Sequence, residues 1–175
     1  MLEAQFTRLE NWHAVDTSGG WPDADMLPLG RLALGARATK FTPDEQRTLM
    51  TLWAIARSPL IMGGDLRHLD AATLALLTNR AVLAVKQASR DNRPHFVADG
   101  TRIWSARPVG GAGAYVALFN TTAKPMEVGI ALSMLGLPAT VTATDLWSGQ
   151  TIGRASHRFA RPIPPHGAGL YRLQP

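Results

Sequence analysis

The sequence predicts an α/β segment followed by an all-β segment, that is, parallel βα units and then an antiparallel β-sandwich. Two observations lead to this prediction. Up to about residue 92, apolar residues recur at helical spacing, and short apolar runs separate the helices. Beyond that point short strands alternate with turn signals. Asn92-Arg93-Pro94 is the expected boundary, so we expect two domains, residues 1–92 and 93–175.

The first expected elements are a helix and a strand. Residues 2–12 carry Leu2, Phe6 and Leu9 on one face, which predicts an amphipathic helix. Pro22 then requires an extended backbone at Trp21, which indicates the approach of a strand.

A second helix is expected from Thr42-Pro43-Asp44-Glu45. This start combines an N-cap hydroxyl, a proline at the first helical position and a capping-box glutamate. Leu49, Leu52 and Trp53 then repeat on one face, and the helix should end before Pro59.

Two further elements complete the α/β segment. Leu60-Ile61-Met62, closed by Gly63-Gly64, has the pattern of a strand that is buried on both faces. Asp70 caps another helix, which we expect to run through Leu77 and on to Val85. This alternation predicts parallel βα units, in which functional loops lie at the carboxyl ends of the strands.

The all-β segment shows short strand patterns separated by turns. Asp99-Gly100 and Ser148-Gly149 are hairpin signals, and Gly110-Gly111-Ala112-Gly113 predicts a flexible hairpin loop. Strands at such intervals are typical of a small antiparallel sandwich. The expected strands cover residues 95–98, 103–107, 114–120, 126–132, 141–146 and 169–173.

Composition and charge exclude several classes of function. The net charge is +5, but the basic residues are scattered and form no stripe with aromatic residues, so we expect no nucleic-acid partner. No apolar run reaches the length of about 18 residues that a membrane span needs, so we expect no membrane partner. The histidines are isolated and there is no cysteine, so we expect no metal and no cofactor. The compartment, bacterial cytoplasm or secreted, stays open.

Asp23 and Asp25 are the first candidate site residues. On an extended segment, residues i and i+2 point the same way and lie roughly 6.6 Å apart. Retaining glycosidases use two carboxyl groups about 5–5.5 Å apart, so the spacing permits a catalytic pair. A structural or turn role for at least one of the two is the alternative that we favour, since Asp is common in turns.

Asp65 is the third candidate. It follows the Gly63-Gly64 turn at an expected strand end, where an acid could face a substrate. The alternative that we favour is an N-cap or loop hydrogen bond to Leu66-Arg67-His68.

The segment Trp21-Pro22-Asp23-Ala24-Asp25-Met26, followed by Leu52-Trp53-Ala54-Ile55-Ala56 and Ser58-Pro59-Leu60, resembles the melibiase-type α-galactosidases of glycoside hydrolase family 27, clan D. That family has a (β/α)8 TIM barrel followed by an antiparallel β domain. The resemblance therefore implies that residues 1–92 are the last βα units of such a barrel. It weakens at Lys86-Gln87, where the family usually has an Asn-Gln pair.

The resemblance also implies roles for individual residues. Asp25 and Met26 are expected to bind substrate, Asp25 beside the sugar and Met26 along the pocket wall, with Asp23 as a loop-anchoring acid. Trp21, packing at the strand end, and Asp65 are expected to support the site. The family's nucleophile and acid/base lie on earlier strands, and no segment here resembles them. No catalytic residue is therefore assigned, and we expect the chain to be inactive alone.

The reaction implied by the resemblance is retaining hydrolysis of terminal α-D-galactosides through a covalent glycosyl-enzyme intermediate. The implied partners are an α-galactoside or a related carbohydrate and the missing portion of the barrel or a second copy of the chain. Galactose, N-acetylgalactosamine and another pyranose all stay open as the recognised sugar. A non-catalytic carbohydrate-associated or interaction module is the alternative function.

Overall fold

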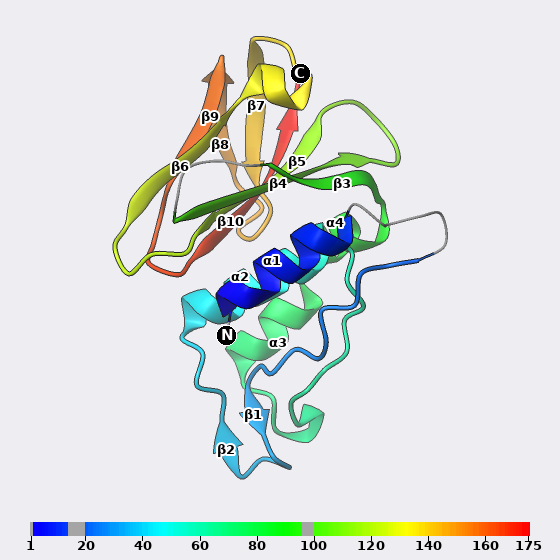
Figure 1. The fold of residues 1–175 in the computed structure, drawn as a ribbon, viewed down its shortest axis with the longest axis vertical. Helices are drawn as coiled ribbons and strands as arrows, with labels where there is room; N and C mark the ends of the chain where they lie inside the picture. The colour runs from blue at the N-terminus through cyan, green and yellow to red at the C-terminus, as the bar shows by residue number, and fades with distance from the viewer. Residues whose placement is uncertain (1, 14–19, 96–99) are drawn as a thin grey trace.

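The computed structural model describes residues 2–13, 20–95 and 100–175. In these ranges a six-stranded sheet carries helices on one face and a two-stranded sheet on the other (Figure 1). The expected strand over residues 95–98 and the hairpin signal at Asp99-Gly100 fall largely outside the described residues. The order of helices first and antiparallel strands second confirms the predicted fold class.

The first two expected helices are present as α1 (Leu2–His13) and α2 (Pro43–Ile55). The predicted capping box begins α2. Thr42 Oγ1 accepts a hydrogen bond from the Glu45 N–H at 3.2 Å, and the Glu45 carboxylate accepts one from the Thr42 N–H at 2.8 Å. Both bonds satisfy main-chain donors at the helix start, which explains why the helix begins there.

The third expected helix is two helices, α3 (Ala71–Thr78) and α4 (Arg80–Gln87), so the prediction of one helix reaching Val85 is wrong. Asn79 has an extended ψ of 107°, and its Oδ1 accepts hydrogen bonds from the N–H groups of Ala81 and Val82. The asparagine side chain thus caps α4 and replaces the continuation of α3. A short 3-10 helix, η1 (Leu66–His68), precedes α3.

The parallel strands expected in the α/β segment are represented by a single bridge between Leu27 and Met62. Leu27 donates its N–H to the Ile61 carbonyl at 2.8 Å and accepts from the Gly63 N–H at 2.9 Å. Ile61 is 48% exposed, so the expectation of a strand buried on both faces is wrong. Such burial needs helices or strands over both faces, which the described residues do not supply. A two-residue hairpin, β1 (Arg31–Leu32) with β2 (Arg37–Ala38), extends the loop after Leu27.

The predicted antiparallel sandwich is confirmed. Its larger sheet has the strand order β3-β4-β5-β10-β7-β8, and β6 pairs with β9 in the smaller sheet. Both β8 and β9 are additional to the strands expected from the sequence, and β3 shares only residue 95 with the expected strand over residues 95–98. The strands are β3 (Ser89–His95), β4 (Thr101–Pro108), β5 (Ala114–Asn120), β6 (Met126–Ala131), β7 (Thr140–Asp145), β8 (Thr151–Ser156), β9 (Arg158–Ile163) and β10 (Ala168–Gln174).

Strand β5 joins the helices to the sandwich. Successive side chains of a strand point to opposite faces, and Phe119 of β5 packs with Trp53 and Phe6 in the core beneath the helices. Val116 and Leu118 instead pack in the second core, between the two sheets. The helices and the larger sheet therefore share one apolar core, and the domain division at residue 92 stays a prediction.

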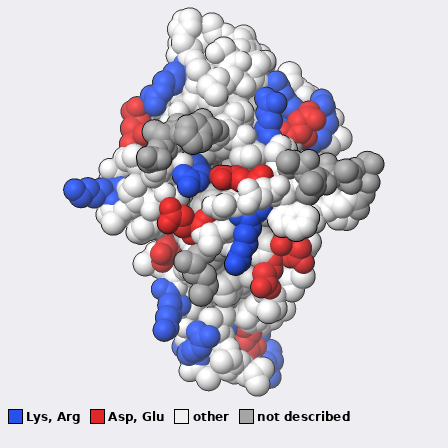
Figure 2. Space-filling view, in the orientation of Figure 1, with Lys and Arg blue, Asp and Glu red and all other residues white. Residues whose placement is uncertain are grey.

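Charged side chains of both signs lie on the face of the molecule shown in Figure 2. On the face shown in Figure 2, lysine and arginine side chains are interspersed with aspartate and glutamate side chains. Among the described residues, no helix is long and apolar enough to cross a membrane.

Candidate functional site

The backbone around Asp25 is fixed by buried partners from α2 and the segment that follows it. Ala24 donates its N–H to the fully buried Ser58 Oγ at 2.9 Å. The indole N–H of the buried Trp53 donates to the Asp25 carbonyl at 2.9 Å. The bridge at Leu27 follows immediately. These contacts hold a segment that has no regular secondary structure of its own.

Asp25 adopts a left-handed backbone conformation with φ 72°. This region is unfavourable for most residues, although aspartate tolerates it better than larger side chains do. The Asp25 N–H donates to Asp23 Oδ1 at 2.9 Å, and Asp25 Oδ1 accepts from the Met26 N–H at 2.7 Å. Asp25 Oδ2 makes no hydrogen bond to the described residues. A strained, exposed acid held by its surroundings is typical of a ligand site.

Asp25 and Met26 line a pocket of about 240 Å³. Met26 is 54% exposed there. Gly63 also lines the pocket, next to Met26, and a Cβ at that position would lie 3.0 Å from the Met26 Cβ and 3.2 Å from the Leu27 carbonyl oxygen, so a side chain there would crowd Met26. The pocket therefore offers one carboxylate, the amide of Gln5 and an otherwise mostly apolar surface. Its other lining residues are Leu2, Pro28, Phe41, Leu49 and Trp53.

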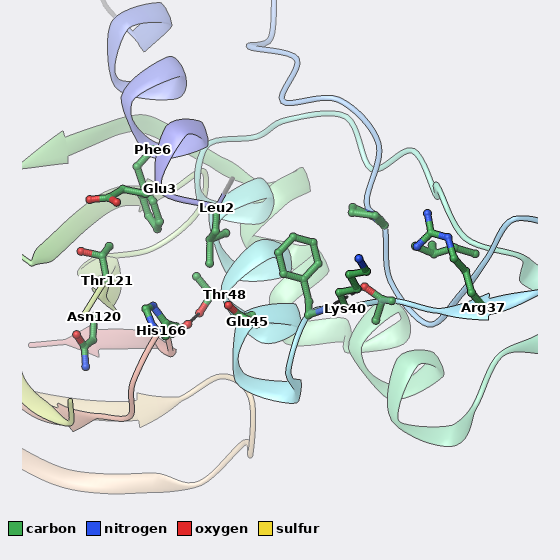
Figure 3. A pocket seen from close by; sticks show the side chains of 14 residues that line it. Leu2, Glu3, Phe6, Arg37, Lys40, Glu45, Thr48, Asn120, Thr121 and His166 are labelled. Atoms are coloured by element: carbon green, nitrogen blue, oxygen red, sulfur yellow. Dashed lines mark hydrogen bonds between the residues drawn. The ribbon is translucent and has the colours of Figure 1, made fainter. Parts of the chain in front are cut away.

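A larger cleft of about 760 Å³ adjoins this pocket and shares Leu2, Pro28 and Phe41 with it. Figure 3 shows it between the first turns of α1 and α2, the loop before α2 and the sandwich. Thr48 Oγ1 donates to the His166 carbonyl at 2.8 Å and ties α2 to the sandwich there. The smaller pocket is the better candidate site because it contains the exposed, fixed carboxylate of Asp25.

The structure does not place Asp23 and Asp25 as a catalytic pair. The left-handed conformation of Asp25 breaks the extended geometry that would point both side chains the same way. Asp23 Oδ1 instead closes a turn by accepting from the Asp25 N–H. Trp21 is 56% exposed, and the Arg57 guanidinium carbon lies 5.9 Å from its ring centroid.

Asp65 lies outside the Asp25 pocket and has its carboxylate occupied. Its Oδ1 accepts from the N–H of Arg67 at 3.0 Å and caps η1. Its Oδ2 lies 2.9 Å from Arg67 Nη2 and 3.1 Å from His68 Nδ1. The hydrogen bonds from Arg67 hold the pKa of Asp65 well below its usual range. The Asp65 N–H also donates to the Arg31 carbonyl at 2.7 Å, which holds the start of β1 against the segment before η1.

Three residues of the site have roles that the sequence reasoning did not assign. Ser58 holds the Ala24 N–H and Trp53 holds the Asp25 carbonyl, both from positions far along the chain. Gly64 allows close approach, because a Cβ there would overlap the Leu29 carbonyl. A glycine at a strand end is a sequence signal of such a close approach. The hydrogen bonds made by Ser58 and Trp53 join residues far apart in the chain, so no short sequence pattern predicts them. The described residues contain no group of three or more acidic, histidine or cysteine side chains placed to hold a metal ion.

A parallel bridge after a helix, an exposed acid beside it and a β-sandwich packed on the helices match the arrangement expected for the last units of a (β/α)8 barrel followed by a β domain. Residues 1–88 match the family model described as Alpha galactosidase A. Residues 98–173 match the model described as the Alpha galactosidase C-terminal beta sandwich domain. The chain belongs to the melibiase-type α-galactosidases, glycoside hydrolase family 27, and corresponds to their C-terminal portion.

Individual relatives agree with this assignment. The chain is 30% identical to Alpha-galactosidase 3 of Arabidopsis thaliana over 90% of its length and 36% of that protein. It is 32% identical to the Cyamopsis tetragonoloba α-galactosidase, again over 90% of the chain and 37% of that protein. A β-L-arabinopyranosidase structure from Geobacillus stearothermophilus superposes with a TM-score of 0.94 at 40% identity, covering 99% of this chain and 41% of that one. The chain thus spans less than half the length of these relatives.

Proposed function

We propose that this chain supplies one wall of a retaining glycosidase pocket that accepts terminal α-D-galactosides or pyranosides with the same ring hydroxyl arrangement. The observation that carries the proposal is the exposed Asp25 carboxylate, fixed by Trp53, Asp23 and the bridge at Leu27. The relatives' names support this substrate class. The β-L-arabinopyranosyl ring differs from the α-D-galactosyl ring only by lacking the exocyclic CH₂OH group.

In this proposal Asp25 accepts hydrogen bonds from sugar hydroxyl groups. A carboxylate forms stronger hydrogen bonds than a neutral acceptor, and its fixed charge also raises the pKa of a neighbouring acid. The exposed Met26 side chain packs against an apolar face of the ring. Asp23 and Trp53 act on the sugar indirectly, because they orient the backbone of Asp25.

The same proposal leaves the covalent chemistry to another part of the barrel. Retaining hydrolysis needs a nucleophile and a general acid/base on opposite sides of the scissile bond. Asp23 and Asp25 belong to one turn and are joined through a backbone hydrogen bond, so they do not offer that arrangement. The chain alone should therefore lack hydrolytic activity. The family match supports an enzyme over a non-catalytic carbohydrate-associated module.

The test joins this chain to the preceding barrel segment of the Geobacillus enzyme, its 40%-identical relative. The chain alone and the chimera are assayed with nitrophenyl α-D-galactopyranoside and nitrophenyl β-L-arabinopyranoside. We expect turnover by the chimera alone. Asp25→Asn should lower kcat/KM about 10- to 100-fold, because the hydrogen bonds from the sugar would no longer be made to a charged group.

Two results would contradict the proposal. Robust turnover by the isolated chain that disappears in both Asp23→Asn and Asp25→Asn would restore the catalytic-pair interpretation. A chimera whose kcat/KM is unchanged by Asp25→Asn would show that this carboxylate does not contact the sugar. Asp91→Asn, at an exposed ion pair with Arg90, is the control for loss of a carboxylate elsewhere.

A further inference from the structure

A second crevice lies where α2 and α3 meet the turn between β7 and β8. Its volume is about 660 Å³, and it shares no lining residue with the Asp25 pocket. Arg47 in this crevice and Trp53 at the Asp25 pocket are six positions apart on α2, so they project about 120° apart around the helix. All walls of the crevice come from described residues of this chain.

The walls of this crevice are fixed by hydrogen bonds. The Trp147 indole N–H donates to Thr51 Oγ1 at 3.0 Å, and Asn79 Nδ2 donates to the Trp147 carbonyl at 3.2 Å. Asp145 Oδ1 accepts from the N–H groups of Trp147 at 2.8 Å and Ser148 at 3.2 Å. The position of the tryptophan and of the turn that carries it is therefore set before any ligand arrives.

Two polar groups in the crevice remain available. The Arg47 guanidinium carbon lies 5.7 Å from the Trp147 ring centroid. Arg47 is exposed and makes no hydrogen bond or ion pair within the described part of the chain. Stacking on an aromatic face orients a guanidinium and leaves its in-plane N–H donors free. Both hydrogen bonds to Asp145 use Oδ1, so Oδ2 remains an available acceptor among these residues.

Together, the free donors of Arg47, the free acceptor of Asp145 and the ring of Trp147 favour one chemical class of ligand. The carboxylates of Asp70 and Asp145 disfavour a multiply charged anion, and the Arg47 cation disfavours a metal ion. Hydroxyl groups both donate and accept, so they can bond to Arg47 and to Asp145 together. Trp147 and Leu76 add apolar surface for the C–H groups of a ring. We propose that this crevice is a secondary binding site for a neutral saccharide, separate from the Asp25 pocket.

The test uses the whole chain and D-galactose as the probe, with ¹⁵N–¹H spectra recorded during titration. Loss of one indole signal in Trp147→Phe identifies the Trp147 resonance. We expect saturable movement of that resonance, with an affinity about tenfold weaker in Arg47→Ala because the principal donor is gone. Arg154→Ala, an exposed arginine on β8, is the matched control and should leave the affinity unchanged. Melting curves establish that each variant is folded.

The outcomes separate this site from the proposed glycosidase pocket. The Asp25→Asn variant should show the same affinity for D-galactose at the Trp147 resonance as the unaltered chain, whether or not the substitution lowers hydrolysis by the chimera. The inference is overturned if the Trp147 resonance does not move with D-galactose, or if Arg47→Ala binds as tightly as the unaltered chain. Movement with inorganic phosphate but not with D-galactose would also overturn it, since that result identifies an anion site.

Discussion

The indole N–H of Trp53 lies 2.9 Å from the main-chain carbonyl of Asp25, across 28 positions of sequence. Trp53 is buried in the core that the helices share with the sheet, so this bond connects the core directly to the exposed acid. A buried indole N–H without a partner is unfavourable, and the Asp25 carbonyl satisfies it. The conformation of Asp25 is thereby coupled to the packing of α2.

Trp53→Phe tests this coupling. Phenylalanine keeps much of the apolar volume but removes the N–H donor, so the Asp25 carbonyl loses a partner. We expect a loss of about 1–3 kcal/mol in the free energy of unfolding, which combines the hydrogen bond with a small cavity. Denaturant unfolding measures it. Trp12→Phe, at a 62% exposed residue, is the control and should change stability by less than about 0.5 kcal/mol.

Substitutions of Asp25 should separate stability from sugar binding. Asparagine tolerates the left-handed conformation and keeps an acceptor for the Met26 N–H. Alanine does neither. Asp25→Asn should therefore leave the melting temperature nearly unchanged, whereas Asp25→Ala should cost about 1–2 kcal/mol. Equal stability of the two variants would contradict the strain argument.

Acid should weaken the loop anchor at Asp65. The pKa of Asp65 is lowered in the folded chain by hydrogen bonds from Arg67, so its ionised form is favoured by folding. Its stabilisation is fully present above the unfolded-state value of about 3.9 and is lost as the pH falls through the lower folded-state pKa. Asp65→Asn should make the melting temperature less dependent on pH below about 4. A pH profile that keeps its full slope in this variant would rule out Asp65 as the cause.

Hydrogen exchange should distinguish α2 from the segment after it. Leu52, Trp53 and Ile55 are fully or almost fully buried against the sheet, so the amides of α2 should exchange as slowly as those of β5. Residues 60–64 have one parallel bridge and should exchange much faster. This expectation follows from the difference in burial and in backbone hydrogen bonding between the two segments. Fast exchange throughout α2 would contradict it.

Elements with local causes could be predicted from the sequence. The capping box at Thr42 set the start of α2, and the short apolar run before Asn120 identified β5 within its observed bounds. The break at Asn79 was missed because the apolar run continues on both sides of a single capping residue. Strands β8 and β9 were missed because they carry Arg154, Arg158 and Arg161, which weaken the strand pattern.

The residues of the candidate site could be proposed from the sequence, whereas their geometry could not. The segment around Asp25 and Met26 could be recognised by its resemblance to a family. The φ of Asp25, the hydrogen bond from Trp53 and the partner at Ser58 depend on long-range packing, which no local pattern encodes. The turn formed by Asp23 is a local effect, and the frequency of aspartate in turns favoured it.

Because Phe6 and Trp53 pack with Phe119 and Leu170, neither half of the molecule keeps a complete interior once the other is taken away. Clipping the peptide chain near Ala88, between α4 and β3, would leave two pieces that still migrate together on a sizing column. Either piece expressed by itself would expose its part of this apolar core to water, so we expect it to aggregate. Engineers who wish to swap the sandwich between related enzymes would therefore have to carry α1 and α2 along with it.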